Sequence, residues 1–217
     1  MKNIILASAS PRRHELLDLL SIKHEVIPCL EEEKNFNSAK KKETSGDKQN
    51  TTIEEKVLQV AYQKVSCVGK SLPLEKKSNS LIIGADTIVV IDDEIIGKPT
   101  DKADAINMLK KILGKTHEVY TGICIYDSHK DKILTAVERT LVSMIEWSEE
   151  KIIAYIDAES VLDKAGAYAI QGKGAALIDK IEGCYYNVMG LPLSRLVTML
   201  DKLEYNYLIN KKNMKSY

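Results

Sequence analysis

The chain has 217 residues, its 31 Lys and Arg residues are balanced by 31 Asp and Glu residues, and 44% of its residues are hydrophobic. This is the composition of an ordinary globular protein with a substantial core. Zero net charge argues against a protein that coats nucleic acid or an anionic membrane, because both tasks need an excess of basic residues.

Segments with strand and helix patterns alternate along the chain. In chain order, the pattern predicts a strand over 4–7, helices over 11–20 and 53–68, strands over 81–84 and 88–96, a helix over 101–113, strands over 118–126 and 133–145, a helix over 148–157, strands over 165–170 and 175–181, and a helix over 193–203. Asp92 and Asp93 are expected to form a hairpin turn, and Gly114 to end the helix before it. This mixed order of strands and helices predicts an α/β fold.

Two polar stretches interrupt the pattern, at about 34–52 and 70–80. Core-type segments continue on both sides of each, so we interpret them as insertions in a single domain over 1–204, followed by a flexible tail over 205–217. The lysine cluster at 40–42 is read as part of a solvated loop rather than a nucleic-acid patch, because the net charge is zero.

The cysteines are widely scattered, and no CxxC motif is present. They are Cys29, Cys67, Cys124 and Cys184. We expect reduced, buried thiols in a cytoplasmic protein, with neither a disulfide scaffold nor a structural zinc site. The first residues lack the apolar core of a secretory signal peptide, and no apolar run approaches the ~20 residues of a membrane-spanning helix.

The segment Ser8-Ala9-Ser10-Pro11-Arg12-Arg13 has the features of an anion site. Ser10 is placed to cap the following helix, and Pro11 suits the first helical position because its missing N–H is not needed there. Free backbone N–H groups then lie beside two guanidinium groups, which bind phosphate well. A capped surface helix with solvated arginines explains the pattern equally well.

Asp86 lies in the middle of the apolar run Leu81–Val90. A carboxylate there is costly to desolvate unless it is paired, binds metal or faces a cleft, so Asp86 is a candidate general base or metal ligand. The alternative is a structural aspartate that accepts backbone hydrogen bonds.

Three further residues could contact a ligand. Lys64 falls within the apolar arc of its helix, where it either snorkels to water or directs its ammonium group into a cleft. Lys98 follows a strand and is held extended by Pro99, although an ordinary turn lysine is as plausible. Gln171 lies between Ile170 and Gly172 and could present its amide to a nucleobase.

Five blocks in order carry a resemblance: LASASPRRHELL, IIGADTIVV, GKP, DKAGAYAIQGKGA and GCYYNVMGLPL. Together they make the chain similar to the Maf family of nucleoside triphosphate pyrophosphatases, from about residue 4 to residue 200. The resemblance implies hydrolysis of a nucleoside triphosphate to monophosphate and pyrophosphate with Mg²⁺ or Mn²⁺ as cofactor. Threonine after the aspartate is similar to the subfamily that acts on dTTP and UTP.

The resemblance also implies roles for individual residues. Asp86 matches the catalytic aspartate, and Glu32 with Asp86 would hold the metal. The positions tied to substrate preference are Arg12, Thr87 and Gln171, and those that line the triphosphate cleft are Ser8, Arg13, Lys64 and Lys98. Ala169 stands where the family usually has glycine.

The implied fold is that of inosine-triphosphatase-like enzymes: an elongated mixed sheet flanked by helices, with two lobes around a cleft. The expected partner is the nucleotide, with no nucleic acid and no membrane, and a homodimer is left open. A non-catalytic nucleotide-binding regulator of cell division and septum formation is the alternative function. The sequence does not distinguish standard from modified pyrimidine nucleotides.

Overall fold

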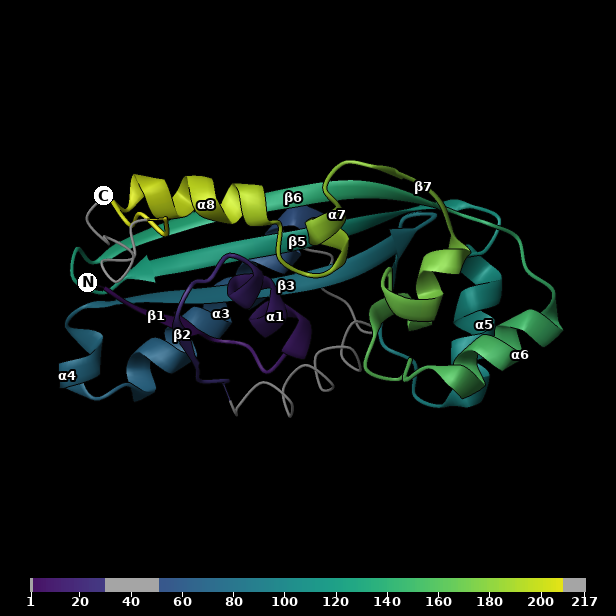
Figure 1. Cartoon of the computed structure of the whole chain (residues 1–217), viewed down its shortest axis with the longest axis horizontal. Helices are drawn as coiled ribbons and strands as arrows, with labels where there is room; N and C mark the ends of the chain where they lie inside the picture. Colours follow the sequence, from purple (N-terminus) through teal and green to yellow (C-terminus); the bar gives the residue numbers. More distant parts are fainter. Residues whose placement is uncertain (1, 30–50, 209–217) are drawn as a thin grey trace, which may run out of the picture. The chain divides into compact units, whose positions relative to one another are not determined.

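The computed structural model describes residues 2–29 and 51–208 of the chain (Figure 1). The chain divides into two units, each built from separate stretches of sequence. Unit 1 comprises Met1–Asp86, Gly122–Ala136 and Leu193–Tyr217, and unit 2 comprises Thr87–Thr121 and Val137–Pro192. The single domain predicted over 1–204 stays a prediction.

The strands form a seven-stranded mixed sheet in the order β2-β1-β3-β5-β6-β7, with β4 paired to β3. They are β1 (Asn3–Leu6), β2 (His24–Val26), β3 (Ser80–Ile91), β4 (Glu94–Ile96), β5 (Thr116–Asp127), β6 (Lys132–Met144) and β7 (Ile178–Glu182). β1 runs parallel to β2 and β3, whereas β4 is antiparallel to β3 and β7 to β6.

The α-helices are α1 (Pro11–Leu19), α3 (Ile53–Ser71), α4 (Leu74–Lys77), α5 (Lys102–Ile112), α6 (Glu149–Ala158), α7 (Tyr185–Val188) and α8 (Leu193–Lys202) (Figure 1). The predicted α/β class, with a mixed sheet flanked by helices, is confirmed. The cleft between two lobes stays a prediction. No helix in the described ranges is both long and apolar enough to cross a membrane.

In unit 1, the apolar face of α3 packs against β1, β3 and β5. The buried residues of this cluster are Ile5, Ala7, Ala61, Val65, Val68, Leu72, Ile82 and Cys124. The helix begins at a capping box: Thr52 Oγ1 accepts a hydrogen bond from the Glu55 N–H, and the Glu55 carboxylate accepts one from the Thr52 N–H, at 3.2 and 2.8 Å. The two backbone donors are thereby satisfied, which fixes where α3 begins.

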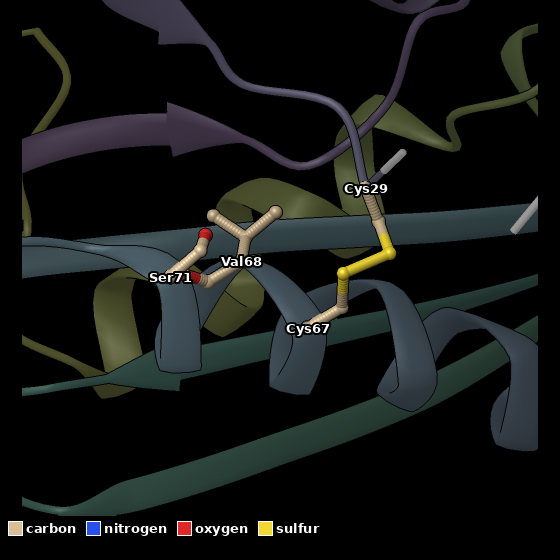
Figure 2. Close-up of a disulfide and its surroundings, with 4 residues drawn as sticks. All are labelled: Cys29, Cys67, Val68 and Ser71. Atoms are coloured by element: carbon tan, nitrogen blue, oxygen red, sulfur yellow. A yellow bond between two sulfur atoms is a disulfide. The ribbon is translucent and has the colours of Figure 1, made fainter. Parts of the chain in front are cut away.

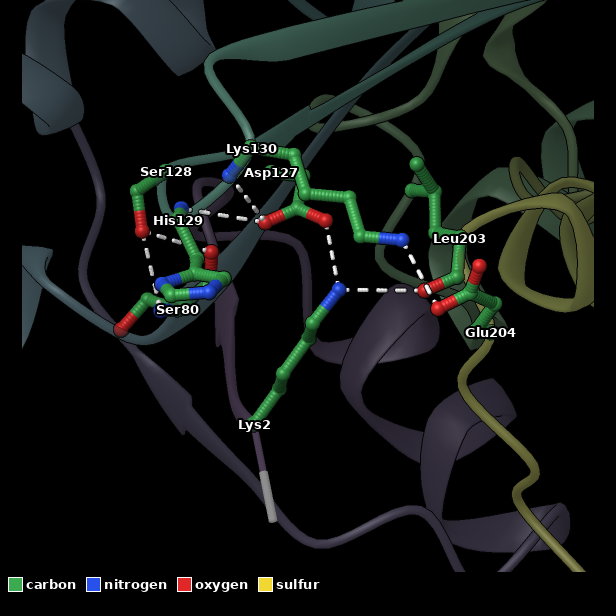
Figure 3. A network of polar contacts seen from close by, with 8 residues as sticks. All are labelled: Lys2, Ser80, Asp127, Ser128, His129, Lys130, Leu203 and Glu204. Atoms are coloured by element: carbon green, nitrogen blue, oxygen red, sulfur yellow. Dashed lines mark hydrogen bonds and ion pairs between the residues drawn. The ribbon is translucent and has the colours of Figure 1, made fainter.

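A polar network joins the distant segments of unit 1 (Figure 3). Lys2 Nζ, just before β1, donates to Asp127 Oδ2 at 2.5 Å and to the Leu203 carbonyl at 3.0 Å. Lys130 pairs with Glu204 at 2.8 Å. Burial alone would raise the pKa of Asp127, but the hydrogen bonds from Lys2 and from the Lys130 backbone hold that pKa below its usual value.

In unit 2, α5 and α6 pack on the sheet around an apolar cluster. Its buried residues include Val89, Ile91, Leu109, Ile112, Val119, Val142, Ile152, Tyr155 and Leu177. Asp101 caps α5 by accepting a hydrogen bond from the Asp104 N–H at 2.8 Å, and Gly114 takes φ +72° just after the helix. Both features agree with the predicted ends of this helix.

The hairpin prediction is confirmed, but the break predicted before it is wrong. Asp92 and Asp93 both have positive φ, 49° and 62°, and connect β3 to β4. β3, however, runs without interruption from Ser80 to Ile91, through Asp86. A single polar residue does not end a strand whose backbone stays extended between its neighbours in the sheet.

The strand predicted over 165–170 is wrong, and that over 175–181 begins late. A 3₁₀-helix occupies Ala165–Ala167, where Gly166 and Ala167 have φ of 73° and 59°. A second 3₁₀-helix covers Gly172–Leu177, and β7 begins only at Ile178. Left-handed backbone conformations are incompatible with a strand, and a run of small residues does not reveal them.

The expectation of four reduced cysteines is also wrong. Cys29, after β2, forms a disulfide with Cys67 on α3, with the two Cα atoms 5.9 Å apart (Figure 2). The partners are 38 residues apart in sequence and become neighbours only because α3 packs beside β1. Cys124 and Cys184 are free thiols, and Cys124 is buried as expected.

The structure describes the second polar insertion but only the end of the first. Residues 30–50, which include most of the first insertion and Glu32, lie outside the described residues, as do 209–217. The second insertion is partly helical, because α3 extends to Ser71 and α4 covers Leu74–Lys77.

Candidate active site

An ion pair joins α3 to β3 in unit 1. Lys64 Nζ donates to Asp86 Oδ1 at 2.8 Å and to the Ala85 carbonyl at 3.2 Å, and the two side chains are only 13% and 15% exposed. Lys64 therefore directs its ammonium group at the carboxylate rather than into open solvent. Two residues predicted separately from the sequence are thus brought into contact.

A glycine next to this pair sets the spacing between α3 and β3. A Cβ atom at Gly84 would lie 2.6 Å from the Ala61 carbonyl oxygen and 3.3 Å from Lys64 Cβ. Because only glycine leaves this space empty, α3 can approach β3 closely enough for Lys64 to reach Asp86. The G-A-D-T block thus positions the ion pair by backbone shape as well as by charge.

The second cationic element of unit 1 is the start of α1. Arg13 is 8% exposed, and its Nη1 donates to Ser8 Oγ at 3.0 Å. The Ser10 N–H also donates to Ser8 Oγ, at 3.3 Å. A solvated surface arginine is therefore the wrong interpretation for Arg13, whereas Arg12 is half-buried.

Ser10 occupies the N-cap position of α1, and Pro11 the first helical position, as predicted. The Ser10 side chain, however, makes no capping hydrogen bond. Ser8 Oγ instead accepts hydrogen bonds from the Ser10 N–H and from Arg13.

Ser8 follows the carboxyl end of β1, and Asp86 lies on β3 just beyond the residues that pair with β1. β1 and β3 are parallel with Leu6 opposite Ile83, and the Ala7 N–H donates to the Ile83 carbonyl at 2.8 Å. Because the two strands run in the same direction, the chain after β1, which includes Ser8, lies beside the part of β3 that continues to Asp86. The carboxyl ends of parallel strands are where open α/β sheets usually bind ligands.

The remaining predicted residues belong to unit 2. Thr87 Oγ1 lies 2.9 Å from Thr121 Oγ1 and 3.5 Å from the Gly190 carbonyl, so its hydroxyl connects β3 and β5 to the segment after α7. Lys98 is exposed just after β4. The carbonyl of Gly97, the residue before it, accepts a hydrogen bond from the Gly166 N–H at 3.0 Å, which joins two of the sequence blocks.

Gln171 is half-buried, directly before the second 3₁₀-helix. The backbone around it is tightly folded, because a Cβ atom at Gly174 would lie 1.9 Å from the Ala169 carbonyl oxygen. The Ala169 N–H donates to Tyr155 Oη at 3.2 Å. Alanine in place of the family's usual glycine at 169 is therefore accommodated, with the close contact made possible by Gly174.

The sequence analysis assigned no role to Asn187, which is fully buried in unit 2. Its Nδ2 donates to the Val119 carbonyl and to Thr140 Oγ1, both at 2.9 Å, and Thr140 Oγ1 also accepts from the Cys184 N–H at 3.1 Å. Asn187 therefore holds the block around α7 against β5 and β6. The sequence feature that could have indicated this role is a single amide side chain within the largely apolar block GCYYNVMGLPL.

These features define an α/β protein in which a buried arginine and a largely buried lysine–aspartate pair lie near the carboxyl end of the parallel strand β1, a site suited to a phosphate-bearing ligand. The model of the family described as Maf-like protein matches residues 3–203, and the chain belongs to the Maf family.

Relatives with assigned names cover nearly the whole chain. It is 49% identical to a dTTP/UTP pyrophosphatase of Ruminiclostridium cellulolyticum over 94% of this chain and 97% of that protein. The corresponding protein of Dictyoglomus thermophilum, which has the same name, is 46% identical over 95% and 99%. That of Bacillus anthracis, again so named, is 45% identical over 93% and 96%.

Proposed function

We propose that this protein is a nucleoside triphosphate pyrophosphatase that hydrolyses dTTP and UTP at the α–β phosphoanhydride, releasing the monophosphate and pyrophosphate. The observation that carries the proposal is the Lys64–Asp86 pair at 2.8 Å. Family membership and the names of relatives 45–49% identical support the same substrates.

The described residues fit a divalent metal ion. Asp86 offers hard carboxylate oxygens, its side chain is 15% exposed, and Lys64 engages Oδ1. Mg²⁺ in phosphate sites is commonly held by one or two carboxylates together with the substrate phosphates. Asp86 and Glu32, the second ligand implied by the resemblance, would hold Mg²⁺ or Mn²⁺, which would neutralise phosphate charge and polarise the attacking water.

Asp86 is proposed to orient the water and accept its proton, a role that requires an ionised carboxylate beside the reacting phosphate. Lys64 places a positive charge next to that carboxylate, where a phosphate oxygen can share it. Arg13, fixed by Ser8, adds a cationic group for the triphosphate, and Lys98 is a further cation that the resemblance implies. Charge neutralisation and positioning provide most of the rate enhancement in phosphoryl transfer.

The preference for the base is proposed to involve Arg12, Thr87 and Gln171, as the resemblance implies. The Thr87 hydroxyl is held in place by Thr121, which lies within hydrogen-bond distance of it. The Gln171 amide provides both a donor and an acceptor for a pyrimidine edge.

Pyrophosphate release from a panel of pyrimidine and purine triphosphates, with Mg²⁺ and with Mn²⁺, tests the proposal. We expect the highest kcat/KM for dTTP and UTP, and a decrease of about 10²–10³-fold in Asp86→Asn. Asp92→Asn makes the same chemical change in the exposed turn beyond β3 and is expected to stay within about twofold of wild type.

Near-normal turnover in Asp86→Asn would contradict the assignment of Asp86. Nucleotide binding without pyrophosphate release from any triphosphate would instead favour the alternative of a non-catalytic regulator. Circular dichroism of both variants verifies that the fold is retained, so a loss of turnover can be ascribed to the carboxylate.

A further inference from the structure

Two histidines and an aspartate to which no role has been assigned come together in unit 1. His14 and Asp18 are four residues apart on α1, and His24 is the first residue of β2. One potential ligand atom from each of the three lies within 4.8 Å of the others. His24 is buried, with its side chain 1% exposed, whereas the His14 side chain is 50% exposed.

The carbonyl partner of His24 identifies which nitrogen of that ring carries the proton. His24 Nδ1 lies 2.7 Å from the Ile22 carbonyl, which can only accept, so Nδ1 carries a hydrogen and Nε2 carries the lone pair. His14 Nε2 lies 3.4 Å from Asp18 Oδ2, so this carboxylate is placed to hold the outer nitrogen of the His14 ring.

The two remaining nitrogens face each other, with His14 Nδ1 2.6 Å from His24 Nε2. With His24 Nε2 as the acceptor, this contact is a hydrogen bond when His14 Nδ1 carries the hydrogen, and a metal ion can take the place of that hydrogen between the two nitrogens. An acceptor on the far side of each ring, a backbone carbonyl for His24 and a carboxylate for His14, is the arrangement that orients metal-bound histidines. The buried ring is fixed in advance, and the exposed ring leaves an entry path.

We propose that His14 Nδ1 and His24 Nε2 bind one divalent transition-metal ion, with Zn²⁺ as the representative, and that Asp18 orients His14. Ligand nitrogens of tetrahedral Zn²⁺ are about 3.3 Å apart. The pair must therefore open by roughly 0.7 Å, which the exposed His14 can provide by side-chain rotation. Imidazole favours Zn²⁺, Ni²⁺ and Cu²⁺ over Mg²⁺, so this site differs in chemistry from the nucleotide site.

The test is a Zn²⁺ titration of the full-length protein by calorimetry, near neutral pH, without nucleotide and without reductant. We expect one Zn²⁺ per chain and a loss of affinity of at least about tenfold in His14→Ala and in His24→Gln. Because His24 is buried, His14→Ala is the decisive variant if His24→Gln fails to fold.

Two control variants separate this site from others. His129→Ala removes an exposed histidine of unit 1 and is expected to bind Zn²⁺ as wild type does. Asp86→Asn is also expected to keep the affinity, because Asp86 is not a ligand of the proposed ion. Absence of stoichiometric binding in wild type, unchanged affinity in His14→Ala, or loss of binding in Asp86→Asn would each overturn the proposal.

Discussion

His117 on β5 is a histidine that the fold encloses almost completely, at 1% exposure. Its Nε2 lies 2.7 Å from Tyr168 Oη, and the two rings meet edge to face. Burial lowers the pKa of His117 from 6.5 to about 4. The ring is therefore neutral in the folded protein at a pH where the unfolded chain has begun to bind a proton.

This difference predicts how stability depends on pH. Because the folded-state pKa is depressed, the contribution of the neutral His117 ring to the free energy of unfolding is complete above about pH 6.5. It is lost as the pH falls toward about 4, by roughly 1.4 kcal/mol per pH unit at most. Urea unfolding at a series of pH values measures it. In His117→Gln, which can still hydrogen-bond to Tyr168, this part of the slope should vanish, and an identical slope in both proteins would refute the assignment.

Single residues could be predicted from the sequence where their charge conflicts with their surroundings. Lys64 within an apolar helical arc and Asp86 within an apolar run both signalled a buried interaction, and the structure pairs them. Lys98 and Gln171 were also singled out from their sequence neighbours, and their roles stay predictions. The burial of the His24 side chain could not be predicted from neighbouring residues, because it results from packing between α1 and β2.

The close packing of α3 on β5 depends on Gly122, whereas Gly69 within α3 makes no close contact. At Gly122 on β5, a Cβ atom would lie 2.7 Å from the Val57 carbonyl carbon and oxygen and 2.9 Å from the Leu58 nitrogen. All three are backbone atoms of α3 and cannot move independently of the helix. At Gly69, within α3, the nearest atom would lie 3.6 Å away.

We predict opposite effects for alanine at these two positions. Gly122→Ala should lower the free energy of unfolding by about 2–3 kcal/mol, because α3 must move away from β5. Gly69→Ala should raise it by up to about 1 kcal/mol, because alanine favours helix and meets no close contact. Chemical denaturation of both variants measures the difference, and equal effects would contradict this view of the packing.

Whole elements were predictable where hydrophobic periodicity continues for long enough. α5, β5 and β6 begin and end within two residues of the predicted positions. The prediction was wrong over 165–170, where small residues imitate a strand but the backbone turns through positive φ at Gly166 and Ala167. Such turns are set by contacts with distant segments, such as that between Gly97 and Gly166.

At the scale of the molecule, the sequence could not reveal how the chain is divided. β3, β5 and β6 each contribute residues to both units, so neither unit is a continuous stretch of sequence. Composition shifts along a chain detect consecutive domains and are blind to this arrangement. The homodimer and the cytoplasmic location stay predictions.

A disulfide is unexpected in the cytoplasmic protein that the sequence predicts, because disulfides are rare in reducing compartments. The presence of the bond can be tested directly. Thiol titration of the unfolded, unreduced protein should find two free thiols, from Cys124 and Cys184, rather than four. Closing a loop of 38 residues should contribute about 3–4 kcal/mol, so reduction should lower the thermal midpoint. Four titratable thiols without added reductant would show that the bond does not form.

The bond between Cys29 and Cys67 also changes the covalent topology of the molecule, because it turns the backbone from one residue to the other into a closed ring. Cutting a peptide bond inside the ring opens it but releases no fragment. Five lysines between 34 and 48 place several trypsin sites there. A protein cleaved at one of them would migrate as a single species on a denaturing gel until a reductant separates its two pieces.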